Sequence, residues 1–353
     1  MKKYINIDDM VNVNCSNVLD IIQKNEPVSR KEITQLSGLS WGGMTKIVNK
    51  LLENGYITEK KAKSASASGR IPSVLRVNTE KNFVIGLDIN KTGLNATVMD
   101  LTGKSLKSFS ANVSAKTREG FIAEITAFVS EIFAVFGTNN IISIGVAMQG
   151  TVDCNQGISV RFPDIKDWSN VPIREILENR FNVKAFIEHD PDCLLYPHLD
   201  YRKAENTILL RIDKSIGMAV AIGGKVLKGI GILEIAHNTI VPNGKKCTCG
   251  ATGCLEAYVY PCIEKGRINS EAINDLITPL CITIKNMTNI FNADRVILTG
   301  ALMEYCNEFS GQITSCLKNL KCTAYVEFTN ISDYAIRGAA LIAINKTITS
   351  LII

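Results

Sequence analysis

Apolar residues recur at helical spacing three times in the first 60 residues, at 18–22, 33–36 and 44–52. The second of these predicted helices opens with Ser29-Arg30-Lys31-Glu32, in which a hydroxyl and a carboxylate three residues apart form a capping-box pattern. Gly38 then breaks the helix before the third apolar face begins. A helix, a glycine-containing turn and a second helix predict a helix-turn-helix module.

Two short apolar segments at 56–58 and 74–77 follow the third helix and are expected to be strands. The residues between them are small or basic, and Arg70 lies near the predicted tip. Two strands behind such a helix form a wing, so Arg70 is a candidate for the minor groove of DNA.

The third helix is the candidate recognition helix, because its N-terminal part carries side chains that bond to phosphates and base edges. The candidate DNA-binding residues are Trp41, Thr45, Lys46, Asn49 and Lys50, together with Arg70. Gly42 and Gly43 are unusual inside a helix, and they allow a close backbone approach to DNA or a later helix start. A three-helix protein-interaction module is the alternative interpretation.

The rest of the chain alternates apolar strands with helical stretches, the pattern of α/β layers. The expected strands are 83–89, 95–100, 141–147, 186–190, 207–212 and 295–300, and the longest expected helices are 119–135 and 271–289. Two of these strands, 83–89 and 186–190, have an acid at or next to the carboxyl end, Asp88 and Asp190. Acids at strand ends indicate ligand contacts, since such sheets bind ligands at the carboxyl ends of their strands.

Composition narrows the class of protein. The chain has 353 residues, of which 46% are hydrophobic, enough for two or three units with real cores. No apolar run is long enough for a bilayer, and no signal-peptide pattern opens the chain. The cysteine count is eleven, an odd number that favours free or metal-bound thiols in a reducing cytoplasm.

Positive charge is concentrated at the N-terminal end. Residues 1–80 contain 12 basic and 8 acidic side chains, whereas the remaining residues contain 27 and 26. This excess favours a nucleic-acid contact, although a solvated basic face would explain it as well.

Four side chains form a candidate metal site: His237, Cys247, Cys249 and Cys254. Three thiols and one imidazole are the ligands of a closed tetrahedral structural zinc site, and the intervening glycines permit the tight turns that it needs. The alternative is that three of the eleven cysteines fall close together by chance.

From about residue 19 to 344 the chain resembles the ROK family (repressors, open reading frames and sugar kinases), and within it the regulators with an N-terminal winged helix. Its matching motifs are Ser29-Arg30 with Gly38-Leu39-Ser40, Gly69–Pro72, Gly145–Asp153 and, most specifically, Cys247–Glu256. The resemblance implies an α/β chain with two parts. A winged helix-turn-helix at 1–78 would precede, at 79–353, a two-lobed actin/hexokinase-like fold with a sugar cleft and a structural Zn²⁺ in the C-terminal lobe.

The chain departs from the family's kinases in its nucleotide loops. Asp88-Ile89-Asn90-Lys91-Thr92 lacks the two glycines of the first phosphate loop, and Asp213-Lys214-Ser215 replaces the second. Thr299-Gly300-Ala301 is a reduced form of the adenosine-side glycine run. A phosphate cradle needs exposed backbone N–H groups, and Asp213 would repel a polyphosphate, so we expect no enzyme activity. Retention of function through a different loop geometry is the alternative.

The positions that contact the sugar in this family are better preserved in the chain than the nucleotide loops. By the resemblance, Asp190 matches the kinase base, and Glu234, His237 and Glu256 match sugar contacts, with His237 also a zinc ligand. His189 and Asp164 stand where the family has asparagines, and a packed strand-end histidine is the alternative for His189. The predicted sugar-binding residues are Asp164, His189, Asp190, Glu234, His237 and Glu256.

These features predict a sugar-responsive transcriptional regulator, expected to repress genes of carbohydrate or xylose use. Its expected partners are a double-stranded DNA operator, a sugar or sugar derivative, and further copies of the chain as a homodimer or tetramer. The alternatives are a sugar kinase with a fused DNA-binding module and a regulator controlled by a partner protein.

Overall fold

The computed structural model describes residues 7–61, 73–91, 93–200, 203–213, 215–228, 233–264, 267–329 and 333–350. The chain divides into two compact units, one made of Met1–Gly150, Cys154–Glu188 and Ala339–Ile353 and the other of Thr151–Asp153 and His189–Gly338. The predicted boundary between residues 78 and 79 falls inside the first unit and stays a prediction.

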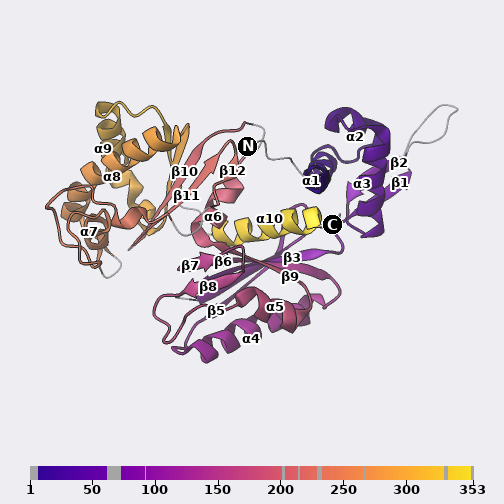
Figure 1. The fold of residues 1–353 in the computed structure, drawn as a ribbon, viewed down its shortest axis with the longest axis horizontal. Helices are drawn as coiled ribbons and strands as arrows, with labels where there is room; N and C mark the ends of the chain where they lie inside the picture. Colours follow the sequence, from indigo (N-terminus) through magenta and orange to yellow (C-terminus); the bar gives the residue numbers. More distant parts are fainter. Residues whose placement is uncertain are drawn as a thin grey trace. The chain divides into compact units, whose positions relative to one another are not determined.

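The N-terminal module of the first unit has the helices and strands that the sequence predicts (Figure 1). They are α1 (Ile7–Asn25), α2 (Arg30–Ser37), α3 (Trp41–Glu53), β1 (Ile57–Lys61) and β2 (Ser73–Val77). The capping box is formed, since the Ser29 side chain accepts from the Glu32 backbone N–H and Glu32 accepts from that of Ser29. Gly38 ends α2 in the left-handed conformation, with φ of 69°.

Helix α3 begins at Trp41 and is capped by the Ser40 hydroxyl, which accepts from the Gly43 N–H at 3.2 Å. Gly42 and Gly43 therefore lie inside the helix. A Cβ at Gly42 would meet no other atom within 4 Å, so this turn of the helix presents bare backbone to its surroundings.

The strands β1 and β2 pair in antiparallel register from Ile57 opposite Val77 to Lys61 opposite Ser73, as a wing requires. Val28, which precedes α2, pairs with Leu75 through an isolated bridge and extends this small sheet. Arg70, the predicted wing-tip contact, lies outside the described residues.

The remainder of the first unit is built on a sheet with strand order β5-β4-β3-β6-β9. Its strands are β3 (Phe83–Asn90), β4 (Gly93–Met99), β5 (Ser105–Asn112), β6 (Ile141–Met148) and β9 (Lys184–His189), with β8 (Ile158–Arg161) outside this sheet. The helices α4 (Arg118–Phe136) and α5 (Ile173–Phe181) cover one face of the sheet, and α10 (Tyr334–Thr349) covers the other (Figure 1).

The winged module shares a hydrophobic core with this sheet and with α10. Buried side chains of α1, such as Val18 and Ile22, belong to one cluster with Met99 and Leu101, and with Ile344 of α10. In addition, the amide of Gln23 donates to the carbonyl of Thr102 at 2.6 Å. The cluster joins the DNA-binding module to the sheet as one packed body.

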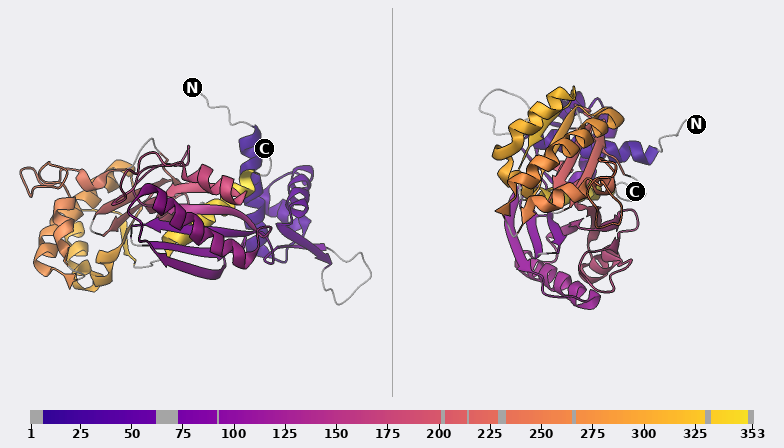
Figure 2. Two further views of the ribbon diagram at one scale, coloured as in Figure 1. Left: turned by 90° about the horizontal axis from the view of Figure 1, so that it is seen from below. Right: turned by 90° about the vertical axis from the view of Figure 1, so that its left-hand side faces the viewer.

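The second unit is built on a sheet with strand order β12-β11-β10-β15-β16, in which β10, β15 and β16 run parallel. Its strands are β10 (Thr207–Ile212), β11 (Ile216–Ile222), β12 (Lys225–Val226), β15 (Arg295–Thr299) and β16 (Tyr325–Phe328), and the shorter β7 (Thr151–Asp153), β13 (Ile263–Glu264) and β14 (Arg267–Ile268) lie outside the sheet. Its helices are α6 (Asp190–Leu195), α7 (Glu256–Val259), α8 (Ser270–Phe291) and α9 (Cys306–Asn319). The helices α8 and α9 lie side by side over its main core (Figure 2).

The fold is therefore of the α/β class predicted from the sequence, with a winged helix-turn-helix followed by two sheets that each pack against helices. None of the described helices combines the length and the apolar character that crossing a bilayer requires.

We expect Gly145→Ala to lower the denaturant midpoint of unfolding markedly. A Cβ at Gly145 of β6 would lie 2.0 Å from the Ala339 carbonyl oxygen of α10, a backbone atom that cannot rotate away. Overpacking of this kind costs about 1–3 kcal/mol or more. The matched control is Gly42→Ala, where the added methyl meets open space. A Gly145→Ala protein that unfolds at the same midpoint as this control would contradict the packing of α10.

Candidate functional site

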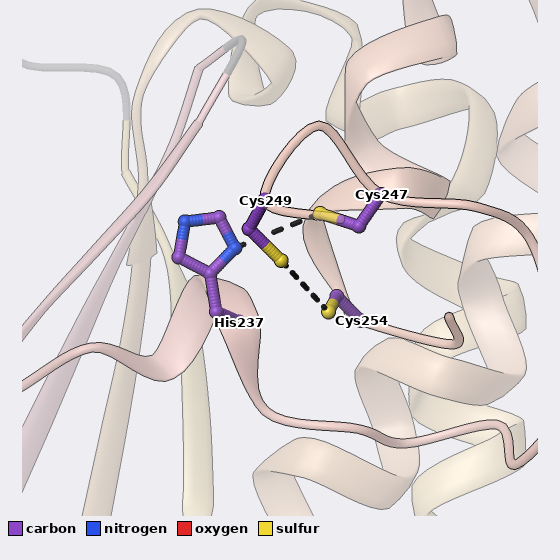
Figure 3. A group of neighbouring side chains, drawn as sticks. All are labelled: His237, Cys247, Cys249 and Cys254. Atoms are coloured by element: carbon purple, nitrogen blue, oxygen red, sulfur yellow. Dashed lines mark hydrogen bonds between the residues drawn. The ribbon is translucent and has the colours of Figure 1, made fainter. Parts of the chain in front are cut away.

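The predicted metal ligands converge in the second unit. The ligand atoms of His237, Cys247, Cys249 and Cys254 all lie within 4.8 Å of one another. His237 comes from a short 3-10 helix, Ile235–His237, and the thiols come from the following loop (Figure 3). The Cys247 sulfur is 3.6 Å from His237 Nδ1, and the sulfurs of Cys249 and Cys254 are 3.7 Å apart. This donor set and its spacing suit one tetrahedral metal ion.

Backbone contacts explain why the loop brings its thiols together. The Cys247 N–H donates to the Ala251 carbonyl at 2.8 Å. This bond closes a tight turn that contains Cys249 and precedes Cys254. Gly253 packs so closely that an added Cβ would lie 1.8 Å from the Val241 carbonyl oxygen, and its φ is +78°. Only glycine fits there, so the position of Cys254 depends on the residue before it.

The thiols differ in acidity. Burial opposes ionisation of Cys247, but hydrogen bonds from Cys249 and His237 outweigh it and lower the pKa of the Cys247 thiol to about 7. Burial and the neighbouring thiols raise the pKa of Cys254. A divalent cation favours thiolates, so metal binding would release protons from this cluster.

His237 also faces a carboxylate. Its Nε2 lies 3.5 Å from Glu256 at the start of α7, while its Nδ1 faces Cys247. A carboxylate on the far nitrogen of a ligating imidazole fixes its tautomer and orientation. The structure thus brings Glu256 and His237, two of the predicted sugar contacts, within reach of one ligand group.

Asp190 is the first residue of α6 and is only 6% exposed. Its carboxylate forms an ion pair with Arg211 of β10, and its other oxygen lies 3.5 Å from His189 Nε2. The same guanidinium contacts Asp213 through Nε at 2.6 Å. One arginine therefore bridges the residue at the kinase-base position and the residue at the second phosphate loop.

Asp213 has a further partner that bears on nucleotide binding. Its Oδ1 accepts from the Ala301 N–H at 2.7 Å, next to Gly300. The carboxylate thereby ties the end of β10 to the turn after β15, the two segments that correspond to nucleotide loops by resemblance.

In the loop after β3, backbone N–H groups likewise donate to side chains of the protein. Asn90 donates to Asp88 at 2.8 Å and accepts from the Gly93 N–H at 3.1 Å. The Lys91 N–H donates to the Gln149 side chain at 3.0 Å. These two backbone donors, which a phosphate cradle would present to a ligand, already have acceptors within the protein.

The remaining predicted sugar contacts are exposed. Glu234 precedes the 3-10 helix that carries His237. Asp164 belongs to the first unit, has a φ of 63° and lies 3.9 Å from Lys91. The Asp190–Arg211 pair and the His237–Glu256 pair both belong to the second unit, while Asp164 belongs to the first.

On the winged module, Trp41, Lys46 and Asn49 are exposed on α3, and Lys50 is half-buried. Thr45 differs from the expectation, because its hydroxyl oxygen is buried and has no hydrogen-bond partner among the described residues. The polar face of α3 is thus formed by lysines and an asparagine.

Two arginines were missed at the sequence level. Arg211 is the single charge in the apolar segment Thr207–Ile212, and that interruption was a usable signal. The sequence places Arg30 in a capping box and a family motif, and the structure shows that it also contacts Asn49 and Glu59. Nothing in the local sequence indicates those partners.

Comparison with known families matches both parts of the chain. The model of the ROK family matches residues 84–260, and a model described as winged helix-turn-helix DNA-binding matches residues 16–58.

Characterised relatives match along most of the chain. The xylose repressor of Bacillus subtilis (strain 168) is 27% identical, with 83% of each chain covered. The DNA-binding transcriptional repressor Mlc of Escherichia coli (strain K12) is 25% identical, with 95% of this chain and 94% of Mlc covered.

Solved structures support the same fold. A ROK family transcriptional regulator, described as a homologue of the E. coli Mlc protein, superposes with a TM-score of 0.82 at 19% identity, covering 97% of this chain and 98% of that one. A ROK family glucokinase from Streptomyces griseus has a TM-score of 0.59 at 20% identity and covers 74% of this chain and 99% of its own. The chain therefore belongs to the ROK family, among the transcriptional regulators that join a winged helix-turn-helix to a ROK domain.

Proposed function

We propose that the protein is a sugar-responsive repressor of carbohydrate-utilisation genes, with xylose as the first sugar to test. The observation that carries the proposal is the extent of its likeness to repressors. Mlc is matched over 95% of this chain, winged module included, whereas the glucokinase structure accounts for 74%. A homodimer, or a tetramer containing such dimers, would place two modules on two operator half-sites.

The effector site that we propose in the second unit contains Asp190, Glu256 and His237, with His189 and Glu234 as further contacts, while Asp164 stays a contact predicted from the sequence. Carboxylates accept hydrogen bonds from sugar hydroxyls, and an imidazole whose Nδ1 binds a metal carries its proton on Nε2 and donates from there in a fixed direction. The sugar would shift the equilibrium between DNA-binding and released states by its different affinity for each.

We propose that the protein transfers no phosphoryl group. The Arg211 guanidinium pairs with the Asp190 carboxylate, the group at the position where a kinase would need a base free to face the sugar hydroxyl. The internal acceptors of Lys91 and Gly93 support the same conclusion. An ATP-consumption assay over a sugar panel tests this, and turnover with any sugar would restore the kinase alternative.

We propose Zn²⁺ as the ion held by His237, Cys247, Cys249 and Cys254. Soft thiolates with one imidazole, all in reach of a single point, suit this metal in a structural role. Bound zinc would hold the loop in shape and keep the His237 ring aimed along its contact with Glu256.

Lys46→Ala should weaken binding to the DNA upstream of the protein's own gene. Because Lys46 is exposed on α3, loss of one phosphate contact should lower affinity similarly on all sequences and reduce the salt slope by about one. Fluorescence anisotropy at several salt concentrations measures both. Lys24→Ala, an exposed lysine of α1, is the control. Unchanged affinity in Lys46→Ala would contradict the assignment of α3 as the recognition helix.

Glu256→Gln should bind DNA as the wild type does but lose its release by sugar. The amide replaces a carboxylate that accepts from sugar hydroxyls and orients His237. The measurement is anisotropy on the same DNA, titrated with a panel headed by D-xylose, and Glu271→Gln on the exposed start of α8 is the control. Normal release from Glu256→Gln would place the effector elsewhere. If no sugar releases the wild type, a partner protein becomes the favoured signal.

Cys249→Ser should lose most of its bound zinc and unfold at a lower temperature than the wild type. Removing one of four ligands opens the site, and the energy of metal binding is part of the folding energy. Elemental analysis of purified protein and thermal unfolding with and without a chelator measure both effects. Cys306→Ser, outside the cluster, is the control. A zinc-replete, equally stable Cys249→Ser protein would contradict the site.

A further inference from the structure

The guanidinium of Arg30 links the recognition helix to the wing. Arg30 is the first residue of α2, and its Nη1 donates to Asn49 Oδ1 on α3 at 3.0 Å. Its Nε and Nη2 donate to the two carboxylate oxygens of Glu59 on β1, at 3.3 and 3.1 Å. Two parallel N–H contacts to one carboxylate form the bidentate pairing that defines an arginine's orientation.

Glu59 is a firm anchor for this arginine. It also accepts from the Ser73 hydroxyl on β2 at 2.6 Å, so both wing strands contribute. The Arg30 and Glu59 side chains are only 20% and 29% exposed. Hydrogen bonds from Arg30 and Ser73 lower the pKa of Glu59, which is therefore ionised at neutral pH.

This contact sets the orientation of the Asn49 amide. An arginine donates hydrogen bonds and accepts none, so the atom of Asn49 that faces Arg30 must be the carbonyl oxygen. The NH₂ group of the amide consequently points away from Arg30, and the Asn49 side chain is exposed. Without Arg30 the amide could rotate and present either end.

We propose that Arg30 is a positioning residue for DNA reading, which holds Asn49 so that its NH₂ group donates to a base-edge acceptor. The acceptors in the major groove are guanine N7 and O6, adenine N7 and thymine O4. An asparagine selects adenine by accepting from its N6 and donating to its N7 together. The Asn49 oxygen keeps a second lone pair beside its bond to Arg30, so the oriented amide can still make both contacts. This inference rests on the proposed DNA-binding function.

A double-mutant cycle on Arg30 and Asn49 tests the proposal. The probe is the DNA upstream of the protein's own gene, with the bound site located by footprinting and then replaced one base pair at a time. Anisotropy gives the affinity of the wild type, Arg30→Ala, Asn49→Ala and the double variant at several salt concentrations. Lys24→Ala is the control for loss of a positive charge on an exposed helix of the same module.

We expect Asn49→Ala to lower affinity about tenfold and to abolish the preference at one base pair. Arg30→Ala should abolish the preference at the same base pair, and the double variant should bind within about threefold of Asn49→Ala, because coupled residues are not additive. Arg30→Lys should keep the salt slope yet lose the base preference, since an ammonium cannot hold Glu59 by two bonds and Asn49 as well.

Two outcomes would overturn the proposal, and a third would refute the function on which it rests. Additive losses with a reduced salt slope would mean that Arg30 contacts a phosphate. An intact base preference in Arg30→Ala, with lower thermal stability, would mean that Arg30 only supports the fold. Absence of selective DNA binding by the wild type would instead refute the proposed function. The wild type is therefore measured before any variant is compared with it.

Discussion

The close packing of α10 is the constraint on which the remaining structure depends. An added Cβ at Gly338 would lie 1.8 Å from the Cys193 carbonyl of α6, and one at Gly145 would lie 2.0 Å from the Ala339 carbonyl. Backbone therefore meets backbone at both contacts, where no side chain can adjust. The helix begins in one compact unit and ends in the other, so both units contribute to holding it.

The same helix supports the DNA-binding module and the strand that leads to the proposed effector site. Ile344 packs in the core shared with the winged module. Lys346 contacts Glu188 at 2.5 Å, and Glu188 is only 1% exposed, immediately before His189 and Asp190. A buried carboxylate is costly without a partner, so this ion pair holds β9 against α10. Helix α10 thus packs against both the winged module and β9 within the first unit.

Charge pairing within this ROK domain supports the proposal that it transfers no phosphoryl group. Arg211 holds Asp190 and Asp213 together, and Asp213 in turn holds the turn at Ala301. Each of these carboxylates has hydrogen-bond or ion-pair partners within the protein. In the hairpin, the Asn90 side chain donates to Asp88 and accepts from the Gly93 N–H. We propose on this basis that the site binds neutral hydroxyl groups and not a polyphosphate, which these carboxylates would repel.

The local sequence determined those features that depend on neighbours along the chain. The capping box at Ser29 and Glu32, the stop at Gly38 and the apolar strands were all predictable, because caps and periodicity act over a few residues. The metal cluster was predictable for the same reason, since three of its four ligands lie within eight residues. By contrast β5 carries an exposed, mostly polar pattern, so only its pairing with β4 makes it a strand.

Tertiary structure decided which distant side chains meet. Arg211 reaches Asp190 across 21 positions, and Arg30 reaches Asn49 and Glu59 across 19 and 29. The burial of the Thr45 hydroxyl also depends on how α3 packs, which its helical spacing alone does not specify. Hydrogen bonds and ion pairs require atoms within about 3–4 Å, and only the folded chain brings such separated residues that close. The family resemblance indicated the classes of ligand, a sugar and a metal ion. The ion pairs and hydrogen bonds among the charged residues became visible only in the folded protein.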